Sequence, residues 1–139
     1  MKGSAGTAGD VFMVDYDLTA GGSSGFGAAV SGGAQAAQCD AQNQAFGHIV
    51  VLVEDTAQDQ EGPFASRGLV SCLVEKSSGA IAPGDPLIAD VTGKRLTADL
   101  VDGAKVVGRL AQAQIADAST PLLATVDFIG DVGFGTHVA

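Results

Sequence analysis

Residues 48–54 read His-Ile-Val-Val-Leu-Val-Glu, and positions 49–53 within them form the longest apolar stretch of the chain. Most of these residues branch at the β-carbon, which favours an extended backbone because branched side chains pack well on a pleated surface. A short, continuous apolar run between polar neighbours is typical of a strand that is covered on both faces. The sequence therefore predicts a buried strand at 48–54.

Five more strands are expected downstream, each bounded by residues that favour turns. Proline presets φ and glycine relaxes it, so Pro83-Gly84-Asp85-Pro86, Ser77-Ser78-Gly79, Thr92-Gly93-Lys94 and Asp102-Gly103 all indicate turns. The apolar segments between them predict strands at 67–75, 87–91, 95–97, 104–110 and 122–129. Short, closely spaced strands without long helices indicate an all-β fold, a small barrel or sandwich.

The composition divides the chain into three zones. Residues 1–46 are rich in Gly, Ala, Ser and Gln and are expected to form an extended N-terminal arm and loops that become ordered on a partner. Alanine would allow a short helix at 26–37, against which Gly32 and Gly33 argue. Residues 47–130 are expected to form the β-rich domain and residues 131–139 a C-terminal tail. The arm contains one apolar island, made of Val11, Phe12, Met13, Val14 and Tyr16.

The types of residue indicate a thin β structure that associates with itself. The 139 residues suit one domain, and their 46% hydrophobic content includes no Trp and one Tyr. Small branched residues must therefore fill the core. Glycine occurs 20 times, which allows close backbone approach, and only 17% of residues are charged. The weakly charged surface favours an oligomer.

The charge excludes two classes of partner. The formal net charge is −9, with seven Lys and Arg in all. Proteins that bind nucleic acid or anionic membranes need clustered cations, so neither partner is expected. The chain shows neither a signal-peptide pattern nor a stretch long enough to span a bilayer, and we expect synthesis in the cytoplasm. Cys39 and Cys72 fit neither a disulfide framework nor a zinc motif, and partly buried thiols are expected.

Candidate catalytic residues lack the context that their chemistry requires. Gly21-x-Ser23-x-Gly25 matches a nucleophile elbow, and His137 follows it in the chain order of a hydrolase. That elbow needs a sheet built from several βα units, which this sequence does not predict. Lys94 stands at a hairpin turn, as the modified lysine does in lipoyl and biotinyl carriers, but without their flanking residues. A small enzyme or carrier domain that uses Ser23 or Lys94 is therefore kept only as an alternative.

The candidate metal ligands are equally isolated. Asp55, Asp59 and Glu61 share a polar loop, but their spacing is not that of a calcium-binding EF-hand. His48 and His137 stand far apart without companion ligands. We therefore expect no catalysis, no cofactor and no metal.

A family resemblance begins at residue 83. Residues 83–130 resemble the head decoration, or capsid cement, proteins of tailed bacteriophages, of the lambda-like type or a related small β-barrel family. The likeness lies in the order of turn and strand elements: Pro86-Leu87, Asp90, Lys94-Arg95, Asp102-Gly103, Val107-Gly108-Arg109-Leu110-Ala111, Leu122-Leu123-Ala124-Thr125-Val126-Asp127-Phe128 and Gly130. It covers about a third of the chain, and about eighty residues precede it, more than the short arm of the lambda-like type.

The resemblance implies a virion protein without enzymatic activity. Such proteins sit as trimers at three-fold or quasi-three-fold positions on the outer capsid surface, bind the major capsid protein and stabilise the expanded head. Their arm commonly adds a strand to the capsid, which here implies capsid contacts by Val11, Phe12, Met13, Val14 and Tyr16. A β-rich tail-fibre or appendage module of a virion remains the structural alternative.

Overall fold

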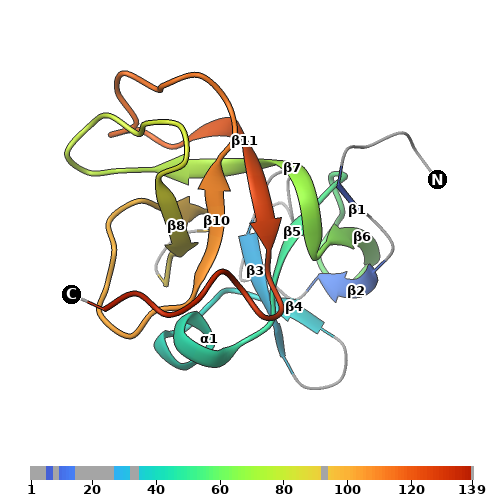
Figure 1. Ribbon diagram of the computed structural model, residues 1–139. Helices are drawn as coiled ribbons and strands as arrows, with labels where there is room; N and C mark the ends of the chain where they lie inside the picture. Colours follow the sequence, from blue (N-terminus) through green and yellow to red (C-terminus); the bar gives the residue numbers. More distant parts are fainter. Residues whose placement is uncertain (1–5, 8–9, 15–26, 32–34, 92–93, 139) are drawn as a thin grey trace.

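The computed structural model describes residues 6–7, 10–14, 27–31, 35–91 and 94–138. Strands dominate these ranges, and the only helix in them has six residues, so the predicted all-β fold is confirmed (Figure 1). The elements are β1 (Gly6–Thr7), β2 (Asp10–Val14), β3 (Gly27–Ser31), β4 (Gln35–Ala37), α1 (Ala41–Phe46), β5 (Ile49–Leu52), β6 (Glu61–Ala65), β7 (Arg67–Glu75), β8 (Pro86–Ala89), β9 (Leu96–Thr97), β10 (Val106–Leu110) and β11 (Leu122–Ile129).

The first sheet is built around a long antiparallel pair of strands. Its order is β1-β7-β11-β10-β8-β9, and β9 also pairs in parallel with β7 at Val74 and Glu75, which joins the two sides of the sheet. β7 and β11 pair without interruption from Leu122↔Val74 to Ile129↔Arg67. Along both strands buried and more exposed residues alternate, as expected for strands with one face on a core.

A second sheet forms a closed barrel in the order β2-β4-β3-β5-β6. The N-terminal strands β1 and β2 lead from the first sheet into this barrel. β1 pairs with β7 at Gly6↔Gly68, and β2 pairs with β6 at Asp10↔Phe64, so both pairings keep one antiparallel register. The N-terminal strands therefore lie along β6 and β7 in succession, from the first sheet into the barrel.

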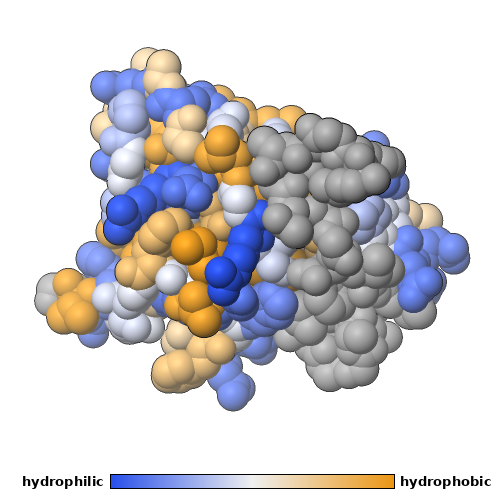
Figure 2. Space-filling view, turned by 45° about the vertical axis from the view of Figure 1, so that its right-hand side comes forward, coloured by the Kyte–Doolittle hydropathy of each residue, from blue (hydrophilic) through white to orange (hydrophobic). Residues whose placement is uncertain are grey.

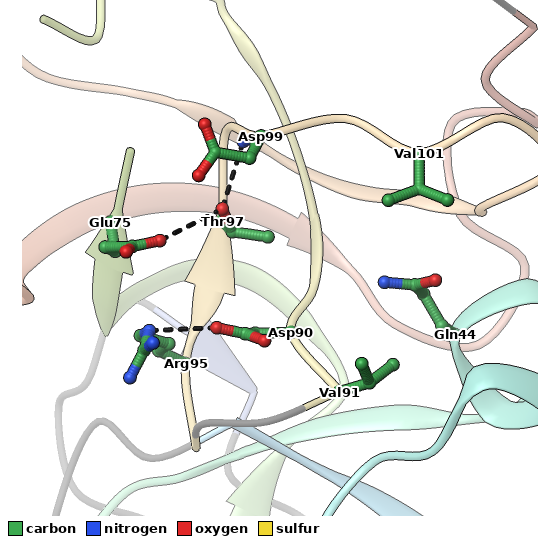
Figure 3. Close-up of a pocket in the computed structure, with 8 residues that line it drawn as sticks. All are labelled: Gln44, Glu75, Asp90, Val91, Arg95, Thr97, Asp99 and Val101. Atoms are coloured by element: carbon green, nitrogen blue, oxygen red, sulfur yellow. Dashed lines mark hydrogen bonds and ion pairs between the residues drawn. The ribbon is translucent and has the colours of Figure 1, made fainter. Parts of the chain in front are cut away.

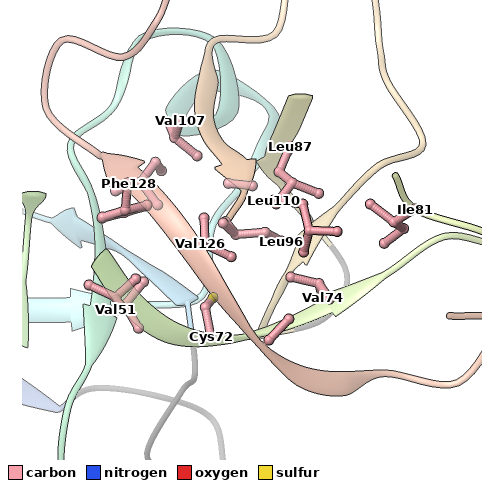
Figure 4. Close-up of a cluster of buried hydrophobic side chains, with 14 of the residues drawn as sticks. Val51, Cys72, Val74, Ile81, Leu87, Leu96, Val107, Leu110, Val126 and Phe128 are labelled. Carbon is pink, nitrogen blue, oxygen red and sulfur yellow. The ribbon is translucent and has the colours of Figure 1, made fainter. Parts of the chain in front are cut away.

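The core consists mainly of aliphatic side chains from both sheets. Val126 and Phe128 of β11 are fully buried, and Leu96 and Leu110 face them in the same cluster (Figure 4). Ile49 and Val51 of β5 belong to this cluster too, so one core runs under both sheets. Each fully buried side chain of this size contributes about 1.5–3 kcal/mol, which makes the cluster the main source of stability.

Gly130 lies where the two sheets meet. Its N–H donates to the Ser66 carbonyl, and its carbonyl accepts from the N–H of Ile49, both at 2.8 Å. A β-carbon at this position would overlap the Ile49 carbonyl oxygen and come within 2.7 Å of the Phe128 ring. Only glycine permits this close approach of the backbones.

The strands expected downstream of residue 47 are confirmed, two of them with the predicted bounds, β7 and β11. β6 was not expected, because Glu61–Ala65 begins inside a polar segment that predicts a loop. The residues considered for a short helix at 26–37 contribute β3 and β4 instead. The helix found is α1, which begins where the Asp40 side chain accepts a hydrogen bond from the N–H of Asn43.

The structure also bears on the expected boundary at residue 46. β3 pairs with β5, and β2 pairs with β6, so strand pairings connect residues on both sides of this position. The tail runs beside β10, since Phe134 and Val106 are joined by a hydrogen bond of 2.7 Å and Lys105 bridges to Thr136. Within the described ranges, no helix has the length and apolarity that a membrane crossing requires.

Candidate functional site

A polar hollow lies at the side of the first sheet. Its volume is about 310 Å³ (Figure 3). Eight residues from several segments line it: Gln44, Glu75, Asp90, Val91, Arg95, Thr97, Asp99 and Val101. In Figure 3, Gln44 and Val101 lie on one side and the charged side chains on the other. We call this feature the polar hollow.

Hydrogen bonds fix the charged wall of the polar hollow. The Thr97 hydroxyl donates to Glu75 Oε1 at 3.3 Å and accepts from the N–H of Asp99 at 3.0 Å. Asp99 Oδ2 in turn accepts from the N–H of Ser77 at 3.0 Å. Glu75 and Asp99 are thus positioned by neutral donors, which leaves their negative charge uncompensated by these bonds.

One of the three carboxylates of the polar hollow has a cationic neighbour. Arg95 Nε lies 2.9 Å from Asp90 Oδ2, with side chains 26% and 12% exposed respectively. The contact is an ion pair without hydrogen-bond alignment at Nε. The lining therefore holds three carboxylates and one guanidinium, and its excess charge is negative. A group that binds here must be cationic to be complementary.

Exposed apolar side chains occur on α1, on the loop after β9 and on the C-terminal tail. Phe46, Val101, Val132 and Val138 are 85%, 49%, 67% and 77% exposed, and we call them the apolar rim. Val101 is itself part of the lining. His137, next to Val138, is bonded to the turn at Asp102-Gly103. Its carbonyl accepts from the N–H of Gly103, and its N–H donates to the Ala104 carbonyl. Figure 2 shows hydrophobic residues in small groups among hydrophilic ones on one side of the molecule.

Lys105 holds the segments of the apolar rim together. Its Nζ donates to the Gly47 carbonyl, next to Phe46, and to the Asp131 carbonyl, next to Val132, the latter at 2.6 Å. The residue is 7% exposed, and burial lowers the pKa of its ammonium group. The Asp131 carboxylate accepts from Arg67 at 3.0 Å, which lowers the pKa of that carboxyl. The end of α1 and the tail are thus fixed to β10 through one buried side chain.

A second surface with exposed apolar residues lies on the outer side of β7 and β11. Leu123 pairs with Leu73, and Thr125 pairs with Ser71, so these four residues share one face of the sheet. Leu69, further along β7, is 44% exposed and Leu123 is 54% exposed. These five residues are uncharged, and we call them the β7–β11 face; Asp127, which pairs with Leu69, and Arg67 lie at its end.

Four of the five residues expected to contact a capsid lie in β2. Val11, Phe12 and Met13 pair with β6, and Met13 and Val14 pair with β4. Both sides of β2 thus have partner strands, so adding this segment to a foreign strand would require some of these pairings to open. Tyr16 lies outside the described residues, as does Ser23. The capsid contacts of these residues remain a prediction.

The other candidate residues stand apart from the polar hollow's lining. Lys94 is partly exposed beside Arg95. Asp55, Asp59 and Glu61 are exposed, and the described part of the chain holds no group of three or more acidic, His or Cys side chains suited to a metal. His48 Nε2 lies 3.0 Å from the Ser66 hydroxyl. Cys39 and Cys72 are both free and buried, and burial raises the pKa of each thiol to about 12.

Sequence reasoning did not predict the polar hollow. The β7–β9 and β8–β9 pairings bring Glu75, Asp90 and Asp99 together, and the hydrogen bond from Gln44 to the Ala89 carbonyl adds Gln44. The strand at 67–75, which carries Leu69, Ser71 and Leu73, was predicted, but not which of its residues face outward. Comparison of the chain with protein-family models, curated proteins and solved structures finds no match.

Proposed function

We propose that the protein is a non-enzymatic structural component of a tailed-bacteriophage virion. It assembles as a trimer, binds the major capsid protein on the outer surface at three-fold or quasi-three-fold positions and stabilises the expanded head. The observation that carries this proposal is the presence of two separate surfaces with exposed large apolar side chains, on a frame of hydrogen-bonded strands.

Two surfaces suit a protein that must contact both itself and a shell. A symmetric oligomer places copies of one patch against each other or against a second patch, and an uncharged patch does this without repulsion between like charges. The β7–β11 face is uncharged and lies on the longest strand pair of the molecule. It is therefore the surface that we assign to contacts within the trimer.

The resemblance to decoration proteins gives further support. The residues that carry it contribute to β8, β10 and β11, neighbouring strands in the order β11-β10-β8 of the first sheet. The ordered sequence elements thus correspond to one continuous part of the fold. On a shell with many equivalent positions, trimeric binding makes modest contacts add up, because each further contact is intramolecular once the first has formed.

The proposal is tested by the mass of the purified protein in solution and by co-sedimentation with expanded, undecorated phage heads. We expect a trimer and saturable binding to the heads. A monomer at every concentration that stays in the supernatant would contradict the proposal. Binding to isolated tails instead of heads would favour the appendage alternative.

The carrier alternative has its own readout. A lipoyl or biotinyl domain would carry an added mass at Lys94 after expression with the corresponding ligase, and Lys94→Arg would abolish it. We expect no such addition and unchanged head binding by Lys94→Arg.

A further inference from the structure

We propose that the polar hollow and the apolar rim together form the docking face for a basic, partly apolar segment of the shell protein. An arginine of that segment enters the polar hollow, and flanking apolar side chains pack on the apolar rim. This inference rests on the proposed function and names the chemistry of the contact.

The first argument is charge. Glu75 and Asp99 are held by neutral hydrogen-bond donors, and only Asp90 is paired with Arg95 within the lining. A guanidinium is planar and offers several N–H donors, so it can donate to two carboxylates at once. The fixed positions of Glu75 and Asp99 reduce the entropy that such binding would cost.

The second argument is that apolar surface borders the charged pocket. Val101, which is 49% exposed, belongs to both features. The Gln44 side chain is fixed, since its Nε2 donates to the Ala89 carbonyl at 2.8 Å. Interfaces commonly combine an apolar contact with a few oriented polar groups, and here the two adjoin.

The third argument decides between a shell protein and a second copy of this chain. A self-contact that paired this face with the same face of another copy would bring the carboxylates together, in a chain of net charge −9. Like charges placed together across an interface suppress association. The surface that binds here must therefore be basic, and we assign it to the shell protein.

The pocket is tested first with a small probe that needs no phage component. N-acetyl-arginine methylamide is titrated into the isotopically labelled protein, with N-acetyl-leucine methylamide as the comparison. We expect weak, saturable NMR shifts at Glu75, Thr97 and Asp99 for the arginine probe, and their loss in the Glu75→Gln/Asp99→Asn variant. Shifts that are absent, scattered over the surface or unchanged in the variant would overturn the inference.

The docking role is then tested on expanded, undecorated heads. Glu75→Gln/Asp99→Asn keeps the acceptor oxygens that Thr97 and Ser77 use, and we expect about tenfold weaker binding with a shallower salt dependence. The control, Glu54→Gln/Asp59→Asn, removes two exposed carboxylates elsewhere and should bind as the parent does.

The two failures are distinguishable. If the parent protein does not bind heads at all, the proposed function fails, and the arginine titration still decides whether the pocket binds a guanidinium. If the parent binds heads and the Glu75→Gln/Asp99→Asn variant binds equally well, the docking inference fails alone. A variant that changes the oligomer mass instead would show that this face serves contacts between copies.

Discussion

The two surfaces with exposed apolar residues differ in charge and in construction. The β7–β11 face consists of five uncharged residues on one continuous antiparallel strand pair, with Asp127 and Arg67, of opposite charge, at its end. The polar hollow with its apolar rim is assembled from α1, the segments around β8 and β9, and the tail, and has an excess of carboxylates. The difference teaches that one small fold can keep a face for its own copies apart from a face for a partner of opposite charge.

The largest loss of stability is expected at Gly130, where the two sheets meet. Gly130→Ala forces a β-carbon against the Ile49 carbonyl and the Phe128 ring, and should lower the free energy of unfolding by about 3 kcal/mol. Gly103→Ala is the control, because its β-carbon meets open space and only the positive φ of 85° opposes it, at about 1 kcal/mol. Denaturant titration measures both values. Equal losses would show that the two sheets are not held together as described.

The next effect separates the two faces by self-association. Leu123→Asp places a charge on the uncharged β7–β11 face and should weaken the trimer by about 2 kcal/mol, roughly thirtyfold. Val101→Asp makes the same change at an equally exposed position of the apolar rim and should leave the mass unchanged. Sedimentation equilibrium measures the association of each variant. An unchanged Leu123→Asp trimer would remove the β7–β11 face from the self-contact.

A somewhat smaller loss of stability is expected from a substitution that loosens only the docking face. Lys105→Met leaves the Gly47 and Asp131 carbonyls without the ammonium donor and should cost about 1.5 kcal/mol. Hydrogen exchange should rise at the end of α1 and in the tail but not along β7 and β11. A uniform rise over both surfaces would contradict the assignment of Lys105 to one of them. Lys105→Arg, which keeps the charge, should restore part of the protection.

The next substitution, under the β7–β11 face, should have a modest effect at neutral pH that shrinks as pH rises. Cys72→Ala removes a small buried group and should cost about 1 kcal/mol at pH 7. The folded thiol has its pKa raised from 9.0 to about 12, so the unfolded chain loses its proton first, and this contribution to stability falls as pH rises through that window. The variant should therefore lose less stability than the parent between pH 9 and 12. Parallel pH profiles would show that Cys72 titrates normally.

The smallest effect on stability is expected at the apolar rim. Phe46→Ser changes a side chain that is 85% exposed and should shift the free energy of unfolding by less than about 0.5 kcal/mol. Binding to heads should nevertheless weaken, because the phenyl ring is free to contact a partner. Thermal unfolding and co-sedimentation measure the two quantities. Ala113→Ser, exposed elsewhere, should change neither.

The sequence allowed most of the first sheet to be predicted, because its strands have clear turns at their ends. β7 and β11 alternate in burial and were predicted with their bounds. β6 was missed because it begins with Glu61, Gly62 and Pro63, which individually disfavour strands and are held there by pairing with β2 and β5. Tertiary pairing outweighed local preference.

The candidate site was less predictable than the fold. The strands that carry Leu73 and Leu123 were predicted, but the register between β7 and β11 is needed to set Leu123 beside Leu73. The polar hollow depends on residues 55 positions apart in the chain, from Gln44 to Asp99, so no local pattern indicated it. The hydrogen bonds of buried Lys105 were not predicted either. Its partners are backbone carbonyls, which every residue has, so the sequence does not reveal them.

The most direct test of a self-contact face and a separate partner face is co-sedimentation with expanded, undecorated phage heads. It should compare the parent, Leu123→Asp and Glu75→Gln/Asp99→Asn at one salt concentration. We predict a saturating trimer on the heads for the parent, and weaker binding for each variant, with only Glu75→Gln/Asp99→Asn still trimeric in the supernatant. A parent that stays unbound, or two variants that bind as the parent does, would contradict the account.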